Sequence, residues 1–289
     1  MINKLITIFL FLLLGVSTVL SQTKLSETQQ AEEILEQGLS EKNPEKRKEA
    51  VIALSLEGNR PQVFPLLSKA LSDSDVNVRL AACASLGETK DSRAIPILEQ
   101  ALNDPIAEVA FAAAQSLWQL NQNSGKEVLM AVLSGEQKTT SSYLSKQKRD
   151  TMRMMKNPSG LFKFMLKTGI GFVPLPGIEA GFTSMEELAK NSNLSGRALA
   201  ALLLAKDNDP DSLEILRDAL SDKDWLVRAA AVHAIALRNQ PGASKDLVLL
   251  FEDKREEVRF RAAAGYLRLE ASSKKSKFKS KIYSSQYRK

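Results

Sequence analysis

The sequence is poor in the residues that catalytic and metal sites most often use. Among its 289 residues it has one cysteine, Cys83, and one histidine, His233. A single cysteine forms no internal disulfide, and a reactive thiol needs a neighbouring base. The patterns HExxH, CxxC, GxSxG and GxxxxGK[ST] are absent. We therefore expect no catalytic residue, no metal site and no cofactor, and we interpret Cys83 as a small buried apolar residue and His233 as a structural or exposed side chain.

Aromatic residues are also scarce, at 6%, whereas the apolar fraction of 44% and the charged fraction of 26% are ordinary for a globular protein. Alanine and leucine supply much of the apolar content. This balance favours helices that pack through small and branched side chains.

A helical motif recurs along the chain. The stretches "DVNVRLAACASLGETKDSRAIPILEQALND" (75–104) and "DWLVRAAAVHAIALRNQPGASKDLVLLFED" (224–253) share the core VRxAA. A large residue closes each core at intervals of 31 or 32 residues, except for one interval of 87, so one unit carries an insertion of about 56 residues. The closing residues are Leu54, Leu86, Leu117, Leu204, Ile235 and Tyr266.

Each unit reads as a helix–turn–helix. Val78, Ala82 and Leu86 recur every four residues and form one apolar stripe, and Ile95, Leu98 and Leu102 form the stripe of the next helix. Such a unit buries its apolar face only by stacking on its neighbours. The sequence predicts an all-α solenoid of about six units.

These units resemble HEAT repeats of the short type found in phycobilisome-lyase-like proteins, over residues 43–136 and 193–271. The resemblance implies that the first and last units act as caps. It also implies a ladder of Asp and Arg side chains between adjacent units, with a structural role and a break at Ala110, where arginine is missing. The ladder residues expected here are Asp73, Arg79, Asp222, Arg228, Asp253 and Arg259.

The first 21 residues have the pattern of an export signal. A basic start is followed by the apolar run "LITIFLFLLL" and by small residues that end at Ser21. We expect cleavage before Gln22 and export to a periplasm or out of the cell; the alternative is an uncleaved membrane anchor.

The insertion, residues 137–192, is basic and then apolar. Its first part predicts a helix with a cationic face, and "PSGLFKFMLKTGIGFVPLPGIEAGF" (158–182) is too broken by glycine and proline for one long helix. Three interpretations remain open, namely packing onto the repeats, contact with an anionic membrane, and a loop that binds a partner. The candidate contact residues are Arg149, Arg153, Lys156, Phe162, Lys163, Phe164, Lys167 and Phe172.

The C-terminal tail, residues 272–289, holds seven Lys or Arg and no acid, whereas the whole chain is only +6. Residues 137–168 hold a further eight against one acid, so the repeats themselves are net acidic. Lysines separated by serines predict a disordered tail, which either stays solvated or anchors to an anionic surface.

The sequence therefore favours an exported, non-enzymatic scaffold that binds a protein partner through the solenoid surface (residues 22–136 and 193–271), as a monomer. The alternative is a peripheral membrane-surface protein that uses the insertion and the basic tail. A third possibility, implied only by the resemblance, is an enzyme of the bilin-lyase type. Nucleic acid is an unlikely partner for an exported chain.

Overall fold

The computed structural model describes residues 25–134 and 196–286, except 208 and 241. The described regular elements are all helical. The expected export signal and the whole of the insertion lie outside the described residues. The helices are α2 (Glu27–Leu39), α3 (Pro44–Leu54), η1 (Ser55–Glu57), α4 (Val63–Ala70), α5 (Val76–Thr89), α6 (Ala94–Ala101), α7 (Ala107–Gln119), α8 (Asn123–Ser134), α12 (Gly196–Leu203), η3 (Leu204–Lys206), α13 (Pro210–Ala219), α14 (Trp225–Arg238), α15 (Ser244–Val248), η4 (Leu249–Glu252) and α16 (Glu256–Gln286).

Local sequence explains where the helices begin. The side chains of Asn43, Asp75 and Asp224 accept hydrogen bonds from backbone N–H groups in the first turns of α3, α5 and α14. These bonds satisfy donors that have no partner inside the helix. In α5, the expected stripe of Val78 and Leu86 is buried, at 1% and 0% exposure.

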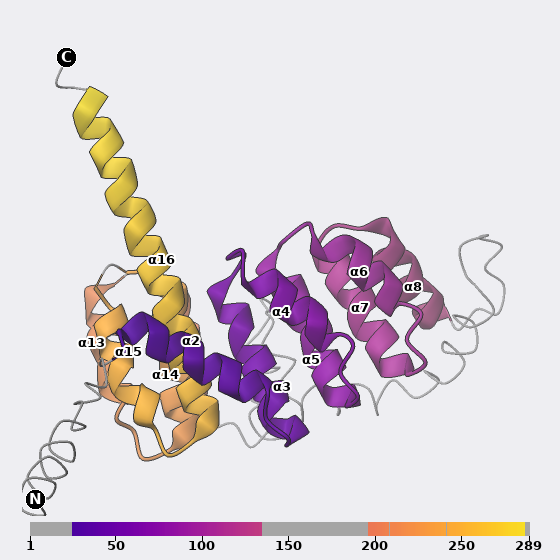
Figure 1. Ribbon diagram of the computed structural model, residues 1–289, viewed down its shortest axis with the longest axis horizontal. Coiled ribbons are helices and arrows are strands. Elements are labelled where there is room, and N and C mark those ends of the chain that lie inside the picture. Colours follow the sequence, from indigo (N-terminus) through magenta and orange to yellow (C-terminus); the bar gives the residue numbers. More distant parts are fainter. Residues whose placement is uncertain (1–24, 135–195, 208, 241, 287–289) are drawn as a thin grey trace, which may run out of the picture.

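The helices form an all-α solenoid, as the sequence predicted. One layer is a row of six helices in the spatial order α12, α14, α16, α3, α5 and α7, in which each helix contacts the next (Figure 1). We call this layer the inner row. Helices α13, α15, α2, α4, α6 and α8 make up the second layer and pack on it (Figure 1).

The order of the repeats in space differs from their order in the chain. Helix α16, from the last repeat, packs against α2 and α3 of the first repeat. The expectation that the first and last repeats cap the solenoid is therefore wrong. The caps of the described array are α12 with α13 at one end and α7 with α8 at the other, and these are the repeats that flank the insertion (Figure 1).

Small side chains explain how closely the row packs. One repeat position, six residues after the expected ladder arginine, holds serine in both α5 and α7. Ser85 of α5 donates to the carbonyl of Val51 in α3 at 3.1 Å, and Ser116 of α7 donates to the carbonyl of Cys83 in α5 at 2.8 Å. Each bond therefore reaches the preceding helix of the row. The same position in α12 holds Leu203, which is 56% exposed. A large residue fits there because α12 begins the described row and has no earlier described helix to contact.

The predicted disorder of the tail is also corrected. Helix α16 runs without a break from Glu256 to Gln286 and projects beyond the array (Figure 1). Residues 272–286 contain no glycine or proline. Once the packed part of α16 has formed, each further residue adds a helical hydrogen bond without a new nucleation cost.

Candidate functional site

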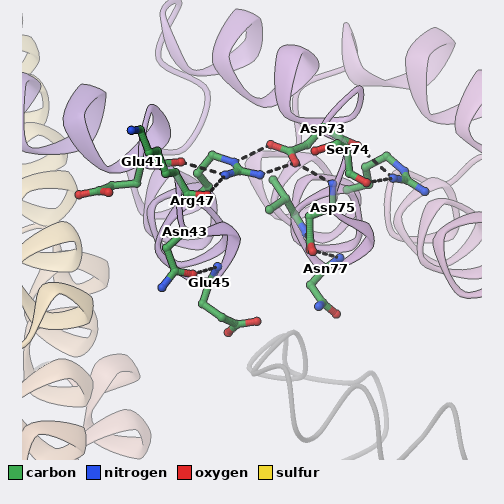
Figure 2. A network of polar contacts seen from close by, with 11 residues as sticks. Glu41, Asn43, Glu45, Arg47, Asp73, Ser74, Asp75 and Asn77 are labelled. Carbon is green, nitrogen blue, oxygen red and sulfur yellow. Dashed lines mark hydrogen bonds and ion pairs between the residues drawn. The ribbon is translucent and has the colours of Figure 1, made fainter.

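A ladder of arginine and aspartate side chains sets the spacing of the repeats. The Arg47 guanidinium donates to both carboxylate oxygens of Asp73 at 2.8 and 2.9 Å, and also to the carbonyl of Glu41 at 2.8 Å (Figure 2). Asp73 accepts in addition from the backbone N–H of Asp75 at 2.9 Å (Figure 2). The hydrogen bonds from Arg47 hold the pKa of the Asp73 carboxyl below its usual value.

The same arrangement recurs along the array. Arg79 binds Asp104 at 2.9 and 3.2 Å, and Arg228 binds Asp253 at 2.7 and 2.8 Å. Arg197 pairs with Asp222. Each of these pairs joins one repeat to the next. Because the same pair recurs between several neighbouring repeats, we assign it a structural role and do not interpret it as a binding site.

The ladder changes at two places. Ala110 replaces arginine in α7, which ends the described row, so no described repeat lies beyond it to supply an aspartate. Arg259 in α16 keeps its bond to the carbonyl of Asp253 at 2.7 Å, but its carboxylate contact is Glu256 of its own helix at 3.1 Å. The second change falls where the last repeat meets the first.

We call the contact of α16 with α2 and α3 the seam. Two ion pairs cross it, Lys46 with Glu256 at 2.9 Å and Arg261 with Glu49 at 3.1 Å. Glu49 and Arg261 occupy the same repeat position, two residues after the ladder arginine, where α5, α7 and α14 have alanine. The seam therefore has charged residues where three other helices of the row have a methyl group.

Close apolar packing supports these ion pairs. A Cβ atom on Gly38 of α2 would lie 2.6 Å from the ring of Phe260 in α16. The rings of Tyr266 and Phe251 meet edge to face at 5.6 Å, and the Tyr266 hydroxyl donates to Glu27 at 3.2 Å. Arg268 of α16 donates to the carbonyl of Leu56 at 2.9 Å. These contacts join the two ends of the array sequence through both close packing and hydrogen bonds.

A pocket of about 410 Å³ opens at the seam, between the N-terminal ends of α16 and α3. Its lining combines four acidic and four basic side chains with one amide and one aromatic ring. Both signs of charge therefore face any molecule that enters. The lining residues are Asn43, Glu45, Lys46, Glu49, Lys254, Arg255, Glu256, Glu257, Arg259 and Phe260.

Several ionisable groups near the seam have shifted pKa values. Burial, with Arg261 and Arg268 nearby, lowers the pKa of His233 to about 4. Burial raises the pKa of Glu57 to about 7, although Arg60 binds it at 2.5 Å and acts in the opposite direction. His233 is therefore neutral at pH 7, which agrees with a structural role.

Cys83 is the second residue considered for a catalytic role. Cys83 is fully buried, and burial raises the pKa of its thiol well above the usual value. Within residues 25–134 and 196–286, no cluster of three or more His, Cys, Asp or Glu side chains could hold a metal ion. The eight candidate contact residues of the insertion lie outside the described residues.

Comparison with known proteins gives the family. The model of the HEAT repeats family matches residues 32–134 and 184–268. The chain belongs to the HEAT-repeat family. A search of curated proteins finds no match.

Two solved structures are similar at low identity. Human deoxyhypusine hydroxylase, in complex with glycerol, is 16% identical, with 85% of this chain and 97% of that chain covered and a TM-score of 0.34. An engineered protein is 15% identical, with 84% and 97% covered and a TM-score of 0.26. Neither similarity carries an argument about function.

Proposed function

We propose that this HEAT-repeat protein is a scaffold that binds a protein partner across the seam. The observation that carries the proposal is the seam pocket at the centre of the inner row. Helices α16 and α3 line it from opposite ends of the chain, so a partner bound there contacts both halves of the array.

The chemistry of the pocket supports a protein partner over a small metabolite. A small-molecule site is usually an apolar cavity with a few polar groups, whereas eight of the ten residues that line this pocket are charged. Surfaces of mixed charge select protein partners by complementary charge and speed their encounter. Arg255 and Arg259 add the residue type that is enriched at such interfaces.

The proposal includes a location and a type of activity. The sequence of residues 1–21 supports export to a periplasm or to the extracellular space. A non-enzymatic role is supported by Cys83, because its burial raises the pKa of the thiol and so disfavours the nucleophilic thiolate.

Site-specific photocrosslinking tests the proposal. A photoreactive residue would replace Lys254, an exposed lysine of the pocket, or Lys69, an exposed lysine of α4 in the second layer. We expect one protein to be crosslinked from position 254 in the producing cells and not from position 69. Equal crosslinking from both positions, or none from either in a folded protein, would contradict binding at the seam.

A further inference from the structure

The projecting end of α16 is not explained by the scaffold. Ser272 donates to Asn239 at 3.3 Å, and among the described side chains this is the last polar contact between α16 and the array. Beyond it, Lys274, Lys275 and Ser276 are exposed and Phe278 is 67% exposed. The helix continues to Gln286 and projects beyond the array (Figure 1).

The charge of this segment is of one sign. Positions 274, 275, 277, 279 and 281 hold lysine, and residues 271–289 contain no acid. The first repeat is the opposite: α2 holds four glutamates and no basic residue. A basic helix that stands clear of an acidic array is available to an external anionic surface.

We propose that the end of α16, residues 273–286, binds the surface of an anionic lipid bilayer. The lysines would contact lipid phosphates, and Phe278 would enter the boundary between headgroups and acyl chains. Clusters of about four to eight lysine or arginine side chains bind anionic lipid surfaces through charge, and Phe278 adds a single apolar contact within such a cluster. Among the helices that the structure describes, none is long and apolar enough to cross a bilayer.

Two other anionic partners fit less well. A protein groove that receives a helix needs apolar anchors at i, i+3, i+4 and i+7, and from Phe278 onward the positions i+3 and i+7 hold Lys281 and Ser285. Nucleic acid would not meet an exported chain. The segment is also long enough to act alone, since 14 helical residues extend for about 21 Å.

Vesicle co-sedimentation of the chain from Gln22 to Lys289 tests the proposal. The vesicles are neutral phosphatidylcholine, or phosphatidylcholine with about 30% phosphatidylglycerol, at low and moderate salt. We expect binding to the anionic vesicles only, and weaker binding as salt rises. Absence of binding to anionic vesicles at low salt would overturn the proposal.

Matched variants locate the contact. Each lysine near such a surface contributes about a fivefold change in partition, so Lys274→Gln with Lys275→Gln should weaken binding about 25-fold. The control is Lys69→Gln with Lys223→Gln, two exposed lysines of the array outside the seam pocket, which changes the net charge equally. The control should weaken binding less than about threefold. Equal losses in both variants would overturn the proposal.

A chain that ends at Ser272 completes the test. It should lose binding while its helical array stays folded, as judged by circular dichroism and thermal unfolding. Retained binding would assign the contact to another segment. Salt-sensitive self-association that the shortened chain loses, without vesicle binding, would identify a second copy of the chain as the partner and overturn the lipid proposal. Photocrosslinking at Lys254 is independent of these results, so the two proposals can fail separately.

Discussion

The ion pair between Glu49 and Arg261 offers a direct test of how the seam holds the two halves of the array together. The perturbation is Glu49→Ala, Arg261→Ala and the double variant. Alanine is the natural residue at this position in α5, α7 and α14, so the double variant makes the seam chemically similar to the other steps. The two single variants leave one charge at the seam without its partner.

The structure sets the expected sizes. The two atoms are 3.1 Å apart and the side chains are 19% and 20% exposed, which lies between an exposed and a buried pair. Exposed pairs contribute up to about 1 kcal/mol, and breaking a buried pair costs about 3–5 kcal/mol. Glu49→Ala should cost about 2 kcal/mol, because Arg261 loses its ion-pair partner across the seam and keeps the hydrogen bond to the Glu257 carbonyl at 2.9 Å. Arg261→Ala should cost about 1 kcal/mol, because Glu49 keeps Lys48 at 3.6 Å.

Urea unfolding followed by circular dichroism measures these costs as changes in the free energy of unfolding. The double variant should lie within about 1 kcal/mol of the natural protein, which gives a coupling energy of about 2 kcal/mol. Glu214→Ala is the control, because this exposed carboxylate pairs with Arg217 inside one half of the array and should matter by less than about 0.5 kcal/mol. Strictly additive single costs would refute the reasoning, since the two side chains would then not interact across the seam.

Four further changes test other features of the array. Gly38→Ala should lower stability by about 1–3 kcal/mol in thermal or urea unfolding, because the new methyl group meets the Phe260 ring, whereas the same change in an open helix raises stability. In the natural protein, acidification from pH 6.5 to 4 should lower the free energy of unfolding by up to about 3 kcal/mol through His233, because the unfolded chain binds this proton at a higher pH than the folded protein does. His233→Gln should remove this loss. In the natural protein, acidification from pH 7 to 4.5 should raise the free energy of unfolding by a similar amount through Glu57, because its raised pKa makes the folded state the better proton acceptor; Glu57→Gln should remove this gain. Both statements are contradicted if the free energy of unfolding changes with pH in the two variants as it does in the natural protein. Arg228→Lys should cost about 1–2 kcal/mol, because lysine cannot make the paired hydrogen bonds of the guanidinium; no loss would show that the ladder is not needed for stability.

The repeats could be predicted from the sequence because their causes are local. Helical spacing of Val78, Ala82 and Leu86 requires a buried stripe, and the structure buries all three. The period of 31 or 32 residues then fixes the number of units. Each of these inferences uses residues that lie within one repeat of each other.

The spatial order could not be read in the same way, because it depends on a contact between residues about 210 positions apart, such as Lys46 and Glu256. Signals of it were nevertheless present. Leu203 breaks the rule of small residues that face the preceding helix, and Ala110 breaks the ladder, and both lie at the ends of the described row. Neighbouring repeats that carry opposite charges in place of alanine can be found by aligning the units.

The tail was predicted wrongly for a different reason. Composition alone treats residues 272–289 as an isolated basic segment, and an isolated helix of that length is barely stable in water. The segment is continuous with α16, whose packed part supplies the nucleus and includes the buried Leu267 and Leu269. Composition describes a segment, whereas helix formation depends on what precedes it.

The position of the seam has a consequence for binding. Apart from the insertion, the described contacts between the two halves of the array lie at the seam and along its edges, where α16 meets α2, α3 and η1, α14 meets η1, and η4 meets α2. A partner that binds across the seam stabilises the joined state by RT ln(1 + [L]/Kd), whereas a partner of one half stabilises that half alone. Arg261→Ala loosens the seam without removing a residue that lines the pocket. In urea that leaves the joined state of this variant only partly populated, its apparent affinity for such a partner should fall by that fraction, because the apparent Kd is the intrinsic Kd divided by the populated fraction. A partner whose apparent affinity is unchanged under those conditions binds elsewhere on the array.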